Sequence, residues 1–379
     1  MSLEVHSTRT LAAKVAEGVP PGTAVTPVPE LVGLTSVPGD SLDLLQWVGW
    51  MTAGPPSLPA GVLRSAGRWA LIRYRWALED RGASIAPTIH ARATRRHTRS
   101  TFSEAIGVGA GGNLSCLRLA PLGHLAVVNL DDAIDPLLRS GLLRRSLGSK
   151  QPDYLVISHL TGGRAAELLA VECKGTVKTE AFAIEQLRAG VIQTIAIEAA
   201  LPMRRIVFAT SLELDSEAPR VRCHAVEVRP EAPPAPTEID PEAASEALLD
   251  AALIRSLRCA GRYDLAEQVR QGSEERDVQI EPDFEIGGRP MAGERAELEV
   301  EGVRLVAQVG IDQRVLEALA APRRERRERL APTVVPSPSE GVRRRAVTPD
   351  AVVQETVMRD GVGIRFEMHG RHERQEIFF

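Results

Sequence analysis

The feature that most constrains the fold is a pair of short apolar segments joined by a glycine turn. Residues 154–158 and 167–173 are almost wholly apolar, and Thr161-Gly162-Gly163 lies between them. Apolar runs of this length, bounded by turn residues, are typical of strands buried on both faces. A helical pattern over about 180–200 follows, and then strand-like segments at 205–210 and 221–228. The order predicts an α/β fold in which a mixed sheet is flanked by helices.

Charged residues stand at the ends of these two apolar segments. Asp153 opens the first, while Glu172 and Lys174 lie near the end of the second. Side chains two positions apart in a strand project to the same face, so Glu172 and Lys174 should point together. If the two strands pair antiparallel through the glycine turn, Asp153 lies beside Glu172. Two carboxylates held that close repel unless a divalent cation neutralises them, and oxygen ligands suit Mg²⁺ or Mn²⁺.

Pro152-Asp153, followed by Glu172-Cys173-Lys174 nineteen positions after the aspartate, resembles the motif of the PD-(D/E)XK nuclease superfamily. The resemblance covers about residues 100–228 and implies a restriction-endonuclease-like core. It implies that Asp153, Glu172 and Lys174 are catalytic, and that the backbone carbonyl of Cys173 is a metal ligand beside the two carboxylates. The pattern is short, and it is also compatible with an aspartate that caps a turn and a glutamate paired with lysine on an exposed strand.

The same resemblance offers two further candidates. Gln186 and Gln193 share one face of the predicted helix, with Gly190 between them. The superfamily often places a glutamine near the active site here, but Gly190 stands where one branch has a tyrosine, which leaves the branch undecided. Many members also take an acidic metal ligand from the helix before the sheet, and Glu104 fits that placement. Its place in a capping-box pattern that begins at Thr101 explains Glu104 equally well.

Proline-rich and glycine-rich stretches divide the chain. The predicted divisions are a loosely ordered arm over 1–60, a helical extension over 61–99, the nuclease-like core over 100–228, a linker over 229–241, a helical and hairpin region over 242–321, a disordered linker over 322–348 and a C-terminal hairpin over 349–379. Glu301-Gly302 and Asp360-Gly361 are the turns that predict the two hairpins. The whole chain is therefore expected to combine a helical N-terminal extension, an α/β core and a smaller α+β C-terminal region.

Within the core, a helix is expected to begin at Thr101 and to end at the glycine cluster Gly107–Gly112, with strands at 115–119 and 125–130 after it. The glycine cluster follows a helix rather than a strand, which argues against a dinucleotide-binding loop. A nucleophile elbow and a phosphate-binding P-loop are absent from the sequence.

Composition limits the partners. The chain is 44% hydrophobic, yet it has no apolar run near the roughly 18 residues of a membrane span. We therefore expect a cytoplasmic protein that does not enter a membrane. The formal net charge of −4 excludes an overall positive field, so any phosphate contact must come from local arginine clusters. A solvated surface or a linker would explain these clusters too. Three clusters are present, at 92–99, 323–329 and 343–345.

The four cysteines have no zinc-site spacing and are read as small buried thiols. The pattern as a whole favours a Mg²⁺-dependent endonuclease that acts on DNA, in restriction or defence against foreign DNA. RNA stays open as a substrate because the motif does not distinguish the sugar. A protein partner or a homodimer stays open as well. The alternative is a catalytically silent nuclease-fold subunit that binds nucleic acid or serves as a scaffold.

Overall fold

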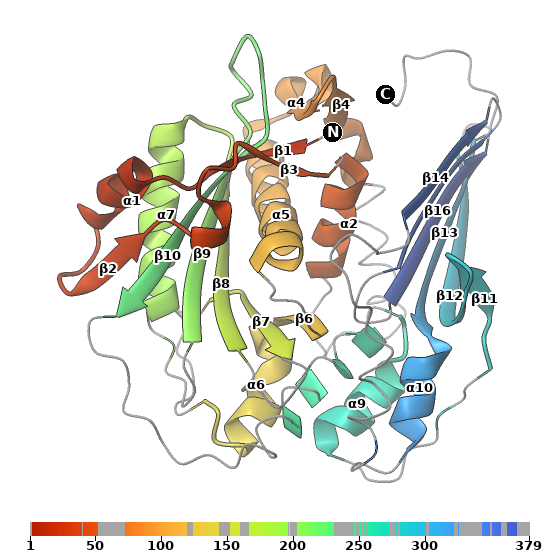
Figure 1. The fold of residues 1–379 in the computed structure, drawn as a ribbon. Helices are drawn as coiled ribbons and strands as arrows, with labels where there is room; N and C mark the ends of the chain where they lie inside the picture. Colours follow the sequence, from red (N-terminus) through yellow and green to blue (C-terminus); the bar gives the residue numbers. More distant parts are fainter. Residues whose placement is uncertain are drawn as a thin grey trace.

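The computed structural model describes residues 2–39, 41–51, 73–119, 124–143, 152–159, 167–195, 197, 203–230, 246–247, 250–251, 253–254, 256–258, 260–272, 278, 281–300, 303–321, 325, 343–348, 351–357 and 362–369. These residues form an α/β body and, beside it, a second antiparallel sheet (Figure 1). The α/β class with a mixed sheet flanked by helices is confirmed.

Ten strands of the described ranges make the sheet of the body. They are β1 (Ser2–His6), β2 (Thr23–Thr26), β3 (Ser36–Pro38), β4 (Leu78–Arg81), β5 (Ser84–Pro87), β6 (His124–Asn129), β7 (Tyr154–His159), β8 (Glu167–Thr176), β9 (Met203–Ser211) and β10 (Arg222–Pro230). Their order is β4-β5-β1-β10-β9-β8-β7-β6, with β2 beside β10 and β3 beside β1. The pairs β1–β10, β1–β5 and β8–β9 are parallel, and the other pairs are antiparallel.

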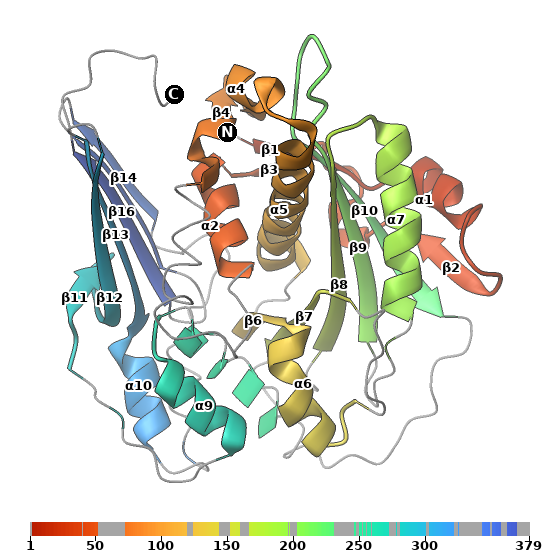
Figure 2. The ribbon, with the colours of Figure 1, turned by 180° about the vertical axis from the view of Figure 1, so that it is seen from behind.

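Helices cover both faces of this sheet, as the two opposite views show (Figures 1 and 2). One face carries α5 (Arg96–Leu114) and α2 (Ser41–Met51), and the other carries α7 (Glu180–Ile195) and α1 (Arg9–Ala16). Shorter elements are α4 (Ile89–Ala93), α6 (Leu130–Arg139) and the turns η1 (Pro29–Leu31), η2 (Arg75–Ala77) and η3 (Ser115–Leu119). No helix within the described ranges is both long enough and apolar enough to cross a membrane.

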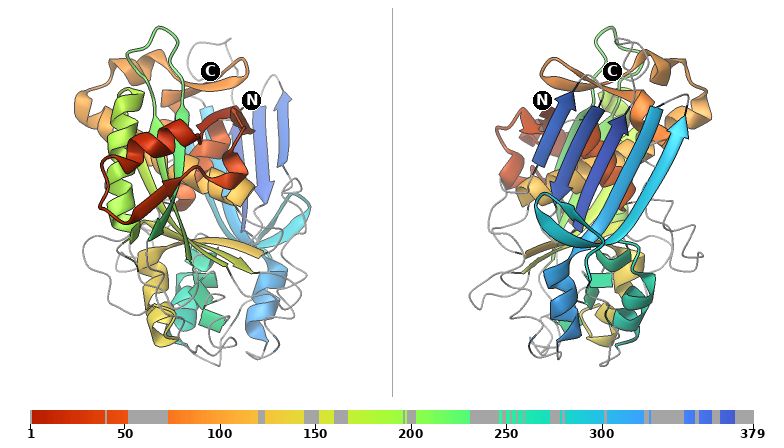
Figure 3. Two further views of the ribbon diagram at one scale, coloured as in Figure 1. Left: turned by 60° about the vertical axis from the view of Figure 1, so that its left-hand side comes forward. Right: turned by 90° about the vertical axis from the view of Figure 1, so that its right-hand side faces the viewer.

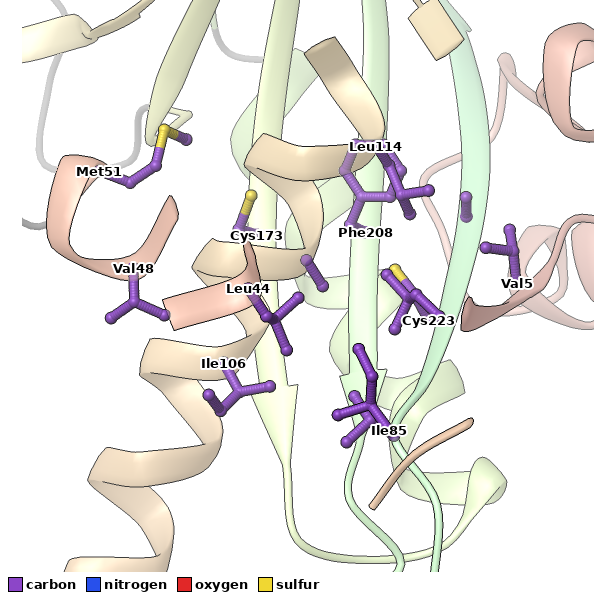
Figure 4. Packing of buried hydrophobic residues seen from close by; sticks show 14 of the residues in the cluster. Val5, Leu44, Val48, Met51, Ile85, Ile106, Leu114, Cys173, Phe208 and Cys223 are labelled. Carbon is purple, nitrogen blue, oxygen red and sulfur yellow. The ribbon is translucent and has the colours of Figure 1, made fainter. Parts of the chain in front are cut away.

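The main apolar core lies between the sheet and the α2–α5 layer. Leu44 and Ile106 from these helices pack with Phe208 and Cys173 from the sheet, and all four side chains are buried (Figure 4). Because side chains alternate along a strand, the neighbours of Cys173 in β8 face the other way, toward α7. The sheet therefore presents alternate β8 residues to two different helical layers.

Glycines let α5 approach β8 closely. A Cβ atom on Gly107 would overlap the backbone carbonyl of Lys174, and one on Gly111 would overlap the sulfur of Cys173. The helix predicted to end at this glycine cluster continues through it to Leu114, so that expectation was wrong. The loss of helix propensity at each glycine, about 1 kcal/mol, is offset by packing against the sheet.

The N-terminal residues are part of the sheet rather than a loosely ordered arm. β1 lies between β5 and β10, and its residues Leu3 and Val5 are buried in the main core. Residues 41–51 of this stretch form the helix α2. Pairing with strands distant in sequence orders this proline-rich segment, and local sequence gives no sign of such pairing. Residues 61–72 of the helical extension predicted over 61–99 lie outside the described residues, and the rest of it contains η2, β4 and β5 as well as α4 and the start of α5.

The core strands agree with expectation except at one place. Residues 115–119, predicted as a strand, form the π-helical turn η3 that continues α5. β6, β7, β8, β9 and β10 lie within a few residues of their predicted bounds, and α7 occupies the predicted helix. Arg205 holds the C-terminal end of α7, because its guanidinium donates to the carbonyls of Thr194 and Ile197.

The second sheet is antiparallel throughout its described strands (Figure 3). Its strands are β11 (Phe284–Ile286), β12 (Arg289–Val300), β13 (Val303–Asp312), β14 (Arg343–Thr348), β15 (Ala351–Val357) and β16 (Val362–His369), in the order β11-β12-β13-β16-β15-β14. Both predicted hairpins are confirmed, as β12–β13 and β15–β16. β14 falls in the stretch predicted to be disordered, so that expectation was wrong for residues 343–348. α9 (Tyr263–Gln271) and α10 (Gln313–Ala320) pack below this sheet.

The contact between α5 and β8 gives a first prediction. We expect Gly107→Ala to lower the free energy of unfolding by about 2 kcal/mol, because the new methyl group meets a backbone carbonyl that has no room to move. Urea denaturation followed by circular dichroism measures the loss.

Gly112→Ala on the same helix is the matched control. Its nearest neighbour would be a Trp47 side-chain atom at 3.0 Å, which can shift. We expect this variant to stay within about 1 kcal/mol of the wild type, since helix propensity is gained at both positions. Equal effects of the two substitutions would contradict the packing described here.

Candidate active site

Strands β7 and β8 form the predicted antiparallel pair and bring the first two candidate residues together. Tyr154 lies opposite Val171, so Asp153 lies opposite Glu172. The backbone N–H of Asp153 donates to Glu172 Oε2 at 3.0 Å. In return, Asp153 Oδ2 accepts a hydrogen bond of 3.0 Å from the N–H of Cys173. Beyond Tyr154 and Val171, hydrogen bonds from backbone N–H groups to these two carboxylates therefore take the place of the backbone hydrogen bonds between β7 and β8.

Pro152 explains why the backbone ladder stops at this point. The register places Pro152 opposite Cys173, and proline has no N–H to donate. In an antiparallel pair, the N–H and C=O of one residue project to the same side. The carbonyl of Cys173 therefore projects to the β7 side, as its N–H does, and receives no ladder bond from Pro152. A backbone oxygen is thus directed to the same place as the two carboxylates.

Glu172 and Lys174 project from β8 to the α7 face, as their spacing predicts. The Lys174 ammonium forms an ion pair with Glu172 Oε1. The glutamate side chain is 0% exposed, whereas the lysine is 23% exposed and reaches the surface. Oε1 is buried, and the Lys174 ammonium is the partner that meets it among the described residues. The sequence alternative of an ion pair on an exposed strand is wrong, because Glu172 is fully buried.

The surroundings of Glu172 disfavour its charge. Burial and, after it, the negative charge of Asp153 raise the pKa of Glu172 to about 7, although Lys174 opposes them in part. A buried carboxylate beside a second one is stabilised by a cation that approaches both.

The donor set can be tested against a hard divalent cation. Asp153, Glu172 and the carbonyl of Cys173 offer oxygen atoms of the type that Mg²⁺ and Mn²⁺ prefer as ligands. No group of three or more His, Cys, Asp or Glu side chains within the described ranges is arranged to hold a metal. Two carboxylates with a backbone oxygen still fit Mg²⁺, which usually keeps several waters and takes one or two carboxylates.

Gly190 brings α7 against Glu172. A Cβ on Gly190 would lie 3.1 Å from Glu172 Cγ and would overlap a methyl group of Val207. No larger side chain fits here, which is a physical reason for a glycine at this position. Gln186 and Gln193 lie about one turn on either side of Gly190 and are half-buried. Neither makes a side-chain hydrogen bond to another described residue, so an auxiliary role for Gln186 stays a prediction.

Glu104 is not brought to the other candidates by any contact among the described residues. It lies on α5, which covers the face of the sheet opposite to Glu172, and its side chain is exposed. Its carboxylate is 3.5 Å from the hydroxyl of Ser100. Only its backbone approaches β8, where a Cβ on Gly175 would overlap the N–H of Glu104. The capping-box alternative is wrong, because α5 begins at Arg96.

The structure adds residues that the sequence did not indicate. Lys174, Ala209, His224 and His6 occupy one row across β8, β9, β10 and β1, and alternate residues of these strands face α7. The two imidazole rings are 5.4 Å apart and nearly perpendicular. Burial lowers the pKa of His224 to about 3, so this histidine is neutral. Such a row depends on the register of strands far apart in sequence, and no local pattern reveals it.

Comparisons with known proteins give no family. No protein-family model, no curated protein and no solved structure matches the chain. The interpretation of the site therefore rests on its own geometry.

Ionisation of Glu172 gives a prediction for the metal-free protein. The folded-state pKa of about 7 lies above the ordinary value of 4.5. The neutral carboxyl of Glu172 therefore contributes its full share of the folding free energy below about pH 4.5. This contribution is lost as the pH rises through 7. We expect the free energy of unfolding of the wild type to fall, relative to Glu172→Gln, by about 3 kcal/mol over this window. Denaturation of both proteins in EDTA from pH 5 to 8 measures the difference; parallel pH profiles would contradict it.

Proposed function

We propose that the chain is a metal-dependent phosphodiesterase with a restriction-endonuclease-like core, most simply a DNA endonuclease. The single observation that carries the proposal is the exchange of hydrogen bonds between Asp153, Glu172 and Cys173, with Lys174 in contact with Glu172. Two carboxylates, a backbone oxygen and one cationic side chain at the end of a strand pair suit hydrolysis of a phosphate ester.

Each residue has a part in the proposed reaction. A divalent cation bound here would polarise the phosphate and a water as a Lewis acid. The carboxylates of Asp153 and Glu172 would bind this cation, and the backbone carbonyl of Cys173 would be the third ligand from the protein. Lys174 is long enough to reach solvent and would orient the attacking water or stabilise charge that develops on the phosphate oxygens. Gln186, one turn before Gly190, is proposed to contact water or substrate from α7.

The burial of Glu172 favours this reading over a silent subunit. An ionised carboxylate beneath α7, with a second carboxylate beside it, costs folding free energy that an apolar residue would not cost. A protein with a purely structural role gains nothing from that arrangement. A cation-binding role accounts for it. Action in restriction or defence is part of the same proposal and depends on finding DNA as the substrate.

Removal of the lysine tests catalysis directly. We expect Lys174→Ala to reduce the rate of Mg²⁺-dependent cleavage of plasmid DNA by about 100-fold or more, because one preorganised cationic group is lost from the transition state. Gel analysis of supercoiled, nicked and linear DNA, with Mn²⁺ and with an RNA substrate in parallel, measures the rate.

Lys14→Ala is the control, since Lys14 is exposed on α1 and takes no part in the site. Its cleavage rate should equal that of the wild type, and both variants should melt near the wild-type temperature. Wild-type protein that cleaves neither DNA nor RNA with either metal would refute the proposed activity, and so would an unaffected Lys174→Ala variant.

Cation binding gives a test that does not depend on cleavage. At pH 8 we expect millimolar Mg²⁺ or Mn²⁺ to raise the melting temperature of the wild type by several degrees, because the cation binds only the folded carboxylate pair. Asp153→Asn should abolish the shift. Cation binding without cleavage would favour the silent subunit over the enzyme. The absence of any shift in melting temperature would contradict cation binding by Asp153 and Glu172.

A further inference from the structure

A cluster of basic side chains lies where α4 turns into α5. We call this surface, made of Arg92, Arg95, Arg96 and His97, the basic corner. Arg95, Arg96 and His97 are exposed, and neither Arg95 nor Arg96 forms an ion pair with any residue that the structure describes. Arg92 is half-buried, and its Nε is buried without an acceptor among the described residues. The corner therefore carries positive charge that no described residue neutralises through an ion pair.

Arg99 holds the corner in one conformation. Its Nε donates to the carbonyl of Thr94 at 2.9 Å, and its Nη2 donates to the carbonyl of Arg92. Thr94 Oγ1 donates to the carbonyl of Ala91 at 2.8 Å, which closes the end of α4. Asp215 lies 3.8 Å from Arg99, so the nearby carboxylate pairs with the structural arginine. The remaining cations are thus presented on a fixed backbone, which lowers the entropic cost of binding a ligand.

The placement of these cations is unfavourable for the helix itself. The first turn of α5 has no acidic residue, and the N-cap residue Arg95 makes no side-chain cap. Cations at the positive end of a helix dipole each cost a few tenths of a kcal/mol or more. Their presence is not explained by helix stability, whereas a polyanion bound at the corner would remove the repulsion.

The corner lies at the same end of the sheet as the candidate active site. A Cβ on Gly175, the residue after Lys174, would overlap the backbone of Ser103 on α5. Arg96 lies seven residues before Ser103, which is about 10 Å along the helix axis. Figure 2 shows α4 and the start of α5 above β8. The corner therefore lies about two helical turns beyond the point where α5 meets Gly175.

We propose that the basic corner binds the phosphodiester backbone of the nucleic acid and directs one strand toward Lys174. The identity of the ligand rests on the proposed nuclease function. The unpaired charge, the fixed backbone and the position of the corner beyond the end of β8 support the location of binding. Because the whole chain carries a net charge of −4, a local cluster of this kind is needed for contact with a polyanion.

The experiment measures binding of a fluorescein-labelled DNA duplex of about two helical turns to the full chain by anisotropy, in EDTA so that no cleavage occurs. Arg95→Ala/Arg96→Ala is compared with Arg9→Ala/Lys14→Ala, which removes two exposed cations from α1 on the other side of the sheet. We expect the corner variant to bind at least about 10-fold more weakly at 0.1 M salt. The slope of log K against log salt should fall in magnitude by about 2.

The α1 variant should stay within about twofold of the wild type. Equal losses in both double variants, or a wild type that does not bind the duplex, would overturn the inference. Failure of the proposed function is distinguishable: a wild type that binds through the corner but never cleaves refutes the nuclease and leaves the corner standing. A wild type that cleaves, with a corner variant that binds and cleaves equally well, refutes the corner alone.

Discussion

Burial of the Glu172 carboxylate is the constraint on which the arrangement of the α/β body depends. A charged group beneath α7 is tolerated only where donors meet it, and here the backbone N–H of Asp153 and the ammonium of Lys174 do so. Asp153 supplies its N–H only in one register of β7 against β8. A slip by one residue would turn every side chain of β7 to the other face and leave Glu172 without that donor. The site and the strand pairing are therefore stabilised together.

The parts of the site that the sequence predicts are those that lie close together along the chain. Two apolar segments around a glycine turn give the β7–β8 hairpin, and the period of two gives the shared face of Glu172 and Lys174. The turn alone then places Asp153 opposite Glu172. The same local signals predict both hairpins of the second sheet, because Glu301-Gly302 and Asp360-Gly361 stand between alternating segments. The divisions of the chain into domains stay predictions.

The parts that the sequence does not reveal depend on distant partners. β1 is a strand because β5 and β10 lie on either side of it, and its own five residues sit in a proline-rich region that suggests an arm. The glycines of α5 suggest the end of a helix, but contact with β8 and α2 outweighs their poor propensity. His6 and His224 meet only through the register of two strands more than 200 positions apart. Local propensity carries no information about these contacts.

The glycines also decide from which side a substrate can reach the site. Gly107 and Gly111 bring α5 onto one face of β8, and Gly190 brings α7 onto the other, so helices cover both faces near Glu172. β7 pairs with β8 only as far as Tyr154, which leaves the last residues of β8 without that neighbour along one edge. The N–H and carbonyl of Cys173 project to this edge, and the Lys174 side chain is half-buried beside it. In the proposed reaction, a phosphate that meets Lys174 would approach along the edge of β8 beyond Asp153, where the described residues leave β8 without the β7 neighbour.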